Sequence, residues 1–167
     1  MWKRIAGLAV AGLFVLTLAA CGGPVEQLET LESPSSGIQQ TAVSPDGFED
    51  NLDGLCEYMQ ENHAVAGERV EMSYKEIGAV GGYRYRFKFN SSTAQVEFYE
   101  FDLDSSDSKA KECLDSVKEK GFFTLLGNDV PATLSGKYMM IYTDASNDQL
   151  NTEKRDEVVD LFVSFHS

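Results

Sequence analysis

The stretch Tyr83-Arg84-Tyr85-Arg86-Phe87-Lys88-Phe89 (YRYRFKF) alternates strictly between an aromatic and a basic residue. Side chains of a β-strand point to opposite faces in turn, so this pattern predicts a strand with its rings buried and its cations outside. Strands with one buried face are typical of antiparallel sheets. The stretch therefore predicts an antiparallel sheet at the centre of the fold.

Residues 94–101 (AQVEFYEF) supply the partner strand. We expect a four-residue turn over residues 90–93 (NSST), because the resulting register buries apolar side chains on one face and pairs opposite charges on the other. The expected cross-strand pairs are Val96 with Phe87, Phe98 with Tyr85, and Glu97 with Arg86.

Two large rings fall on the outward face of this hairpin. In the expected register Tyr99 and Phe101 share that face with Arg84 and Arg86, so the face is only partly polar. Either a helix covers part of it, or it contacts a partner, for example an envelope protein or a small ligand. These four residues form the candidate partner face.

The remaining periodicities complete an α+β pattern around this hairpin. Helical spacing of apolar residues predicts helices at 48–62, 70–77, 106–120 and 152–165, and further strands are expected at 122–126, 130–134 and 137–143. The order is helix, short helix, two strands, helix, two or three strands, helix. We expect one small α+β domain, residues 48–167, whose antiparallel sheet has its helices packed on one face.

The N-terminus has the pattern of a targeting segment. Lys3 and Arg4 precede an uncharged run, IAGLAVAGLFVLTL, whose fourteen residues are fewer than the roughly 20 that a membrane-spanning helix needs. The run ends in Leu18-Ala19-Ala20-Cys21. This arrangement resembles the lipobox of bacterial lipoprotein signals, which has a leucine, two small residues and a cysteine.

The resemblance implies that residues 1–20 are a signal peptide cleaved between Ala20 and Cys21. It also implies that Cys21 carries a diacylglyceryl thioether and a fatty acid, and anchors the chain in a cell membrane with its domain on the extracytoplasmic side. The alternative is an uncleaved anchor, since the uncharged run continues to Val25. Gly22, Gly23 and Pro24 would then lie in its last turn, where they are poor helix formers.

Residues 21–47 are expected to be the lipidated cysteine followed by a flexible tether. Three of the four prolines of the chain fall here among Ser, Gly, Gln and Glu, without apolar periodicity. A flexible coil of 26 residues has a root-mean-square span of about 28 Å. Because such a tether contributes nothing to the core, a chain beginning near Ser44 should fold with nearly full stability.

The charge of the chain argues against nucleic-acid binding. The whole chain has 14 basic and 27 acidic residues, and removing Lys3 and Arg4 leaves a net charge of −15. Phosphates and anionic lipid head groups repel such a protein, so the lipid must supply its membrane attachment. The rings and cations of residues 83–89 also point to opposite faces, so a base could not stack while its phosphate is held.

No pattern of metal-ligating or catalytic residues stands out, and no metal or cofactor is expected. The two histidines, His63 and His166, are expected at helix ends, where an imidazolium favours the carbonyl dipoles. A zinc site from these histidines with Cys56 and Cys113 has the wrong ligand spacing. The two cysteines are expected to be free thiols, with a disulfide as the alternative if their helices pack together.

A cluster of aspartates, Asp102, Asp104 and Asp107, could be a calcium loop. The central glycine and the distal glutamate of such loops are absent, so we expect a helix cap instead.

Two classes of function remain. The first is a non-enzymatic, membrane-anchored binding or accessory module. The alternative is a cell-envelope hydrolase that uses paired carboxylates such as Glu97, Glu100 or Asp102. Glu100 decides between them, because the expected register points it inward, where burial would raise its pKa and let it act as an acid.

Overall fold

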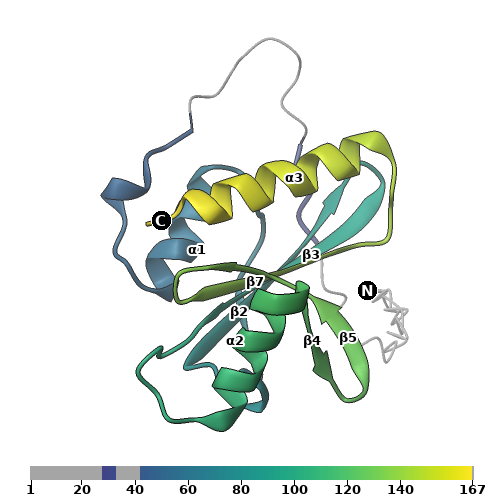
Figure 1. Cartoon of the computed structure of the whole chain (residues 1–167). Helices are drawn as coiled ribbons and strands as arrows, with labels where there is room; N and C mark the ends of the chain where they lie inside the picture. The colour runs from purple at the N-terminus through teal and green to yellow at the C-terminus, as the bar shows by residue number, and fades with distance from the viewer. Residues whose placement is uncertain (1–27, 33–41, 167) are drawn as a thin grey trace, which may run out of the picture.

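The computed structural model of the protein describes residues 28–32 and 42–166 (Figure 1). Its elements in chain order are η1 (Pro45–Gly47), α1 (Leu52–Glu61), β1 (Val70–Glu71), η2 (Lys75–Ile77), β2 (Gly81–Phe89), β3 (Ser92–Glu100), α2 (Ser108–Lys120), β4 (Phe122–Leu125), β5 (Asn128–Pro131), β6 (Thr133–Ser135), β7 (Tyr138–Asp144) and α3 (Gln149–Ser164). Within this part of the chain, five strands form an antiparallel sheet in the order β1-β2-β3-β7-β6, and β4 and β5 form a separate hairpin. The α+β fold, the antiparallel sheet and the order of the main elements are confirmed.

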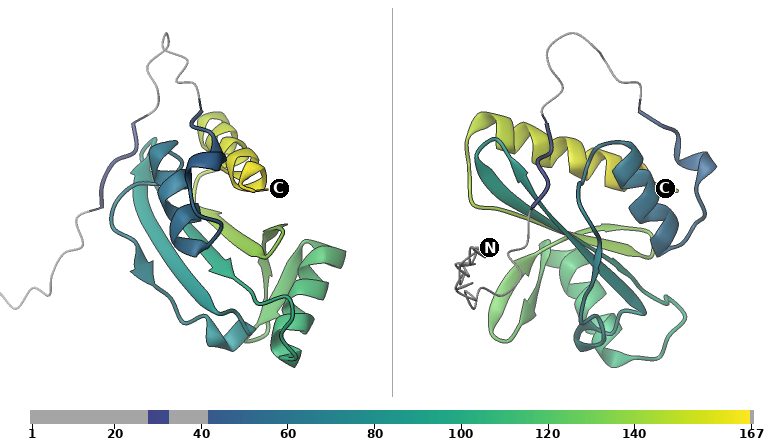
Figure 2. Two further views of the ribbon diagram at one scale, coloured as in Figure 1. Left: turned by 90° about the vertical axis from the view of Figure 1, so that its left-hand side faces the viewer. Right: turned by 180° about the vertical axis from the view of Figure 1, so that it is seen from behind.

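The alternation of β2 divides the molecule into two hydrophobic cores. Tyr85 and Phe87 are fully buried, and with Phe98 they pack under α1 and α3 on one face, here called the inner face. On the opposite, outer face, Tyr99 and Met139 pack with α2 and the β4–β5 hairpin. Figure 2 shows the sheet between these two layers. The expectation that the helices share one face therefore fails for α2, which covers apolar side chains that β3 and β7 present on the outer face.

The turn between β2 and β3 differs from the expected one. It contains only Asn90 and Ser91, whose φ angles of 43° and 64° are both positive, as in the tight turns that suit the twist of a hairpin. The register moves by two residues, so that Phe87 lies opposite Ala94, Tyr85 opposite Val96, and Arg84 opposite Glu97. A shift of two keeps every side chain on its expected face, because the side-chain period of a strand is also two.

The boundaries of several elements also differ from expectation. Residues 70–77 contain β1 and the short η2 rather than one helix, and Gly78 ends η2 with a φ of 78°. Residues 128–135 form two strands, β5 and β6, on either side of Ala132. Asp107 caps α2 by accepting a hydrogen bond from the Lys109 amide at 2.8 Å, which confirms the expected helix cap.

Residues 28–32, which were expected to belong to the tether, lie against β2. The Leu31 amide donates to the Lys88 carbonyl at 2.8 Å, and the Lys88 amide donates to the Glu29 carbonyl at the same distance. The Leu31 side chain is only 7% exposed and belongs to the inner core. The tether as expected, with no core residue before residue 48, is therefore wrong at Leu31.

Substituting Leu31 tests this contact. Removing most of a buried leucine side chain leaves a cavity, so we expect Leu31→Ala to lower the free energy of unfolding by about 2 kcal/mol, near the low end of the usual range. A chain beginning at Ser44 should lose at least as much. Urea melts of both proteins measure the change. Leu103→Ala is the control, because Leu103 is 61% exposed and its loss should cost less than about 0.5 kcal/mol. Melts of Leu31→Ala and the shortened chain that match wild type would contradict the contact.

Candidate functional site

The outer face of β2 and β3 has a covered half and a polar half. Tyr99 and Phe101 lie in the covered half, beneath α2 and the β4–β5 hairpin, and are only 5% and 1% exposed. These two residues of the expected partner face cannot touch a partner in this structure. A helix covers that part of the face, which was one of the two outcomes the sequence left open.

The polar half carries three cations along β2. Arg84, Arg86 and Lys88, here called the basic row, point to the outer face; Lys88 is exposed and the two arginines are partly buried. The Arg84 Nε atom is buried and has no hydrogen-bond partner among the described residues. This Nε atom is therefore an unsatisfied buried donor within the described part of the chain.

Glu97 lies opposite Arg84 on β3 and is 9% exposed. One of its carboxylate oxygens accepts a hydrogen bond from the Tyr99 hydroxyl at 2.6 Å, and the other accepts one from Gln95 at 2.7 Å. Burial, together with this bond to Glu97, raises the pKa of the Tyr99 hydroxyl far above its usual value. Tyr99 and Gln95 thus hold the Glu97 carboxylate in place beside the basic row.

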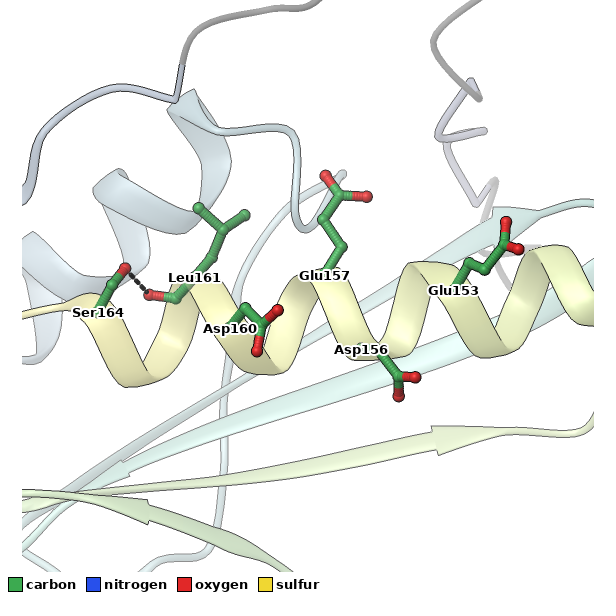
Figure 3. Close-up of a pocket in the computed structure, with 6 residues that line it drawn as sticks. All are labelled: Glu153, Asp156, Glu157, Asp160, Leu161 and Ser164. Atoms are coloured by element: carbon green, nitrogen blue, oxygen red, sulfur yellow. Dashed lines mark hydrogen bonds between the residues drawn. The ribbon is translucent and has the colours of Figure 1, made fainter.

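The inner layer is acidic by contrast. Helix α1 has three acidic residues and no basic one, and α3 has four acidic and two basic residues, whereas α2 on the outer face has four lysines and three acidic residues. Figure 3 shows the exposed side of α3, where a shallow hollow of about 560 Å³ is lined by Glu153, Asp156, Glu157, Asp160, Leu161 and Ser164. The helices on the inner face are therefore more acidic than the helix on the outer face.

The carboxylates of the hydrolase alternative do not converge. Glu97 and Glu100 are three residues apart on one strand, so their side chains leave opposite faces of the sheet. Glu100 points inward, as expected, and its side chain is 19% exposed. Its carboxylate already has two partners: the Lys137 ammonium lies 2.9 Å away, and the Leu52 amide donates a hydrogen bond to it at 3.3 Å. Asp102 is exposed and accepts a hydrogen bond from the Asp104 amide.

A second carboxylate, that of Asp50, lies near Lys137 just before the start of α1. The Tyr138 hydroxyl donates to the Asp50 carboxylate at 2.7 Å, and the Lys137 ammonium donates to the Asp50 carbonyl at 2.8 Å. The Tyr138 hydrogen bond, more than the nearby Lys137 charge, holds the pKa of Asp50 below its ordinary value of 3.8 despite an opposing effect of burial. These contacts connect α1 to β7.

The histidines and cysteines weighed for a zinc site do not form one cluster among the described residues. His63 and His166 follow the ends of α1 and α3, as expected. Cys56 belongs to the inner core and Cys113 to the outer core, and both are free thiols. Among the described residues, no three histidine, cysteine or carboxylate side chains come together as metal ligands would.

The lipobox residues, Ala20 and Cys21, lie outside the described residues. Within the described part of the chain, no helix is long and apolar enough to cross a membrane. The sequence interpretation missed Leu31, whose only signal is a pair of leucines, Leu28 and Leu31, within a polar segment. It also missed that the acidic helices α1 and α3 lie on the face of the sheet opposite the basic row, because this arrangement depends on which face each helix covers.

Comparisons with known proteins identify no relative. No protein-family profile matches the chain, and neither the curated proteins nor the solved structures contain a significant match. Functional inference therefore rests on the chain itself.

The Asp50–Tyr138 hydrogen bond predicts a pH-dependent contribution to stability. Because the pKa of Asp50 is lower in the folded state, its stabilisation is complete above the unfolded value near 3.8 and is lost as the pH falls through the folded value. We expect Tyr138→Phe to cost about 1 kcal/mol at pH 7, a low value because Asp50 is largely exposed. The difference from wild type should shrink below about pH 4.

Tyr142→Phe is the matched control on the same strand. The Tyr142 hydroxyl is buried without a hydrogen-bond partner among the described residues, so its removal should cost nothing at any pH. Denaturant melts of both variants between pH 3 and 7 measure the difference. A cost of Tyr138→Phe that stays constant down to pH 3 would show that Asp50 is not the group involved.

Proposed function

We propose that the protein is a lipoprotein anchored in a cell membrane with its domain on the extracytoplasmic side. There it acts as a non-enzymatic binding or accessory module. The observation that carries the proposal is the sequence Leu18-Ala19-Ala20-Cys21 at the end of an uncharged run of fourteen residues that follows two basic residues. Of the side chains at this boundary, only a thiolate is a nucleophile that alkylates readily near neutral pH. Two acyl chains anchor a protein stably in a bilayer.

The basic row is the contact surface of this module. Lys88 is exposed on this face, and Arg84 and Arg86, which precede it on the same side of β2, are partly exposed. In a chain with a net charge of −15 after removal of its leader, three neighbouring cations stand out as a place where an anionic group can bind. The hydrolase alternative has no comparable support, because Glu97 and Glu100 lie on opposite faces and Glu100 is held by Lys137.

The anchor is tested by replacing its nucleophile. We expect Cys21→Ser to abolish acylation, because a hydroxyl is far too weakly acidic to supply the nucleophile, and cleavage after Ala20 should fail or shift as well. Metabolic labelling with a fatty acid and partition into detergent measure the result in cells.

Gly22→Ser is the matched control, because it introduces the same side chain one residue later and leaves Cys21 intact. It should label and partition like wild type. If Cys21→Ser also labels like wild type, the lipobox interpretation is wrong, and the apolar N-terminus is an uncleaved anchor.

A further inference from the structure

Docking of residues 28–32 shortens the connection between the anchor and the domain. If Cys21 holds the lipid, as proposed above, only residues 22–27 separate it from Leu28. A fully extended chain of that length keeps the two Cα atoms within about 25 Å. The domain is therefore held close to the bilayer by one fixed point on its surface, rather than at the end of a 26-residue coil.

That fixed point lies beside the basic row. The main chain of Lys88 pairs with Glu29 and Leu31, so the chain from the anchor reaches the domain next to this exposed cation. The side chains of Arg84 and Arg86 follow on the same face of the same strand. The acidic helices α1 and α3 cover the opposite face of the sheet.

We propose that the basic row contacts the anionic head groups of the bilayer that holds Cys21, with α1 and α3 turned away from it. An anionic surface attracts the cations of β2 and repels the carboxylates of the inner layer, and both effects act only within a Debye length of about 8 Å. The lipid supplies the attachment, and the cations of β2 together with the acidic helices α1 and α3 set the orientation. This inference names the partner of the contact surface and rests on the lipid anchor.

Lysine reactivity on vesicles tests the orientation. The chain from Cys21 to Ser167 is coupled through Cys21 to a maleimide-bearing lipid, in vesicles of phosphatidylcholine alone or mixed with phosphatidylglycerol. Coupling under native conditions leaves Cys56 and Cys113 unmodified, because they are 0% and 6% exposed and burial raises the pKa of both thiols to about 11. Acetylation of each lysine is then followed by mass spectrometry.

We expect acetylation of Lys88 to slow by at least about threefold on vesicles that contain phosphatidylglycerol, and much less on phosphatidylcholine alone. Lys137 is the internal control, because it precedes β7 at the end of the sheet opposite Lys88 and should react equally on both. Arg84→Gln should weaken the protection of Lys88. Arg155→Gln, which removes the same charge from the exposed side of α3, should not.

Two results would overturn the proposal: an equal acetylation rate of Lys88 on the two kinds of vesicle, or selective protection of Lys137. The basic row would then be a surface for a protein partner. Because the maleimide bond replaces acylation, this result is independent of whether cells acylate Cys21. A failure of labelling in cells would overturn the proposed anchor, whereas unprotected Lys88 on anionic vesicles would overturn the orientation alone.

Discussion

The pairing of β2 with β3 is the constraint on which the rest of the structure depends. A two-residue turn at Asn90 and Ser91 sets their register, and the pleat then sends Tyr85, Phe87 and Phe98 to one core and Tyr99 to the other. Residues 96–99 of β3 are buried on both faces of the sheet. The central strand thereby separates the acidic helices α1 and α3 from the cations of β2 and α2.

Much of this architecture could be predicted from local patterns. The aromatic and basic alternation identified β2 and its buried face, and the apolar stripes identified α1, α2 and α3, because each depends only on the period of its own element. The register was wrong because serine rarely adopts a positive φ, so a turn of two residues at Asn90-Ser91 has a weak signal. The face covered by α2 was missed because it depends on topology, although Tyr99 and Phe101 indicated that either a helix or a partner covers part of the outer face.

The candidate site, like the fold, was predictable from the sequence only in part. Arg84 and Arg86 were placed on the correct face, since the pleat alone decides it, whereas the burial of Tyr99 and Phe101 depends on elements distant in sequence. Leu31 had no periodic neighbours, and a single apolar residue in a polar segment is not a signal of core packing. The interpretation of Cys21 stands on four adjacent residues and is independent of the fold.

The contact of residues 29–31 with β2 also affects how readily two copies of the domain can associate through this strand. A long outer strand presents free amide and carbonyl groups that can pair with another copy of the chain. In this protein β1 pairs with β2 at Tyr83 and Arg84, and residues 29–31 pair with it at Lys88, so two short segments cover a nine-residue strand rich in aromatic residues. Release of Leu31 would expose that end of β2 for pairing between neighbouring molecules. If Cys21 anchors the chain as proposed, neighbouring molecules on one bilayer would meet often, and the pairing of residues 29–31 with β2 would limit their association.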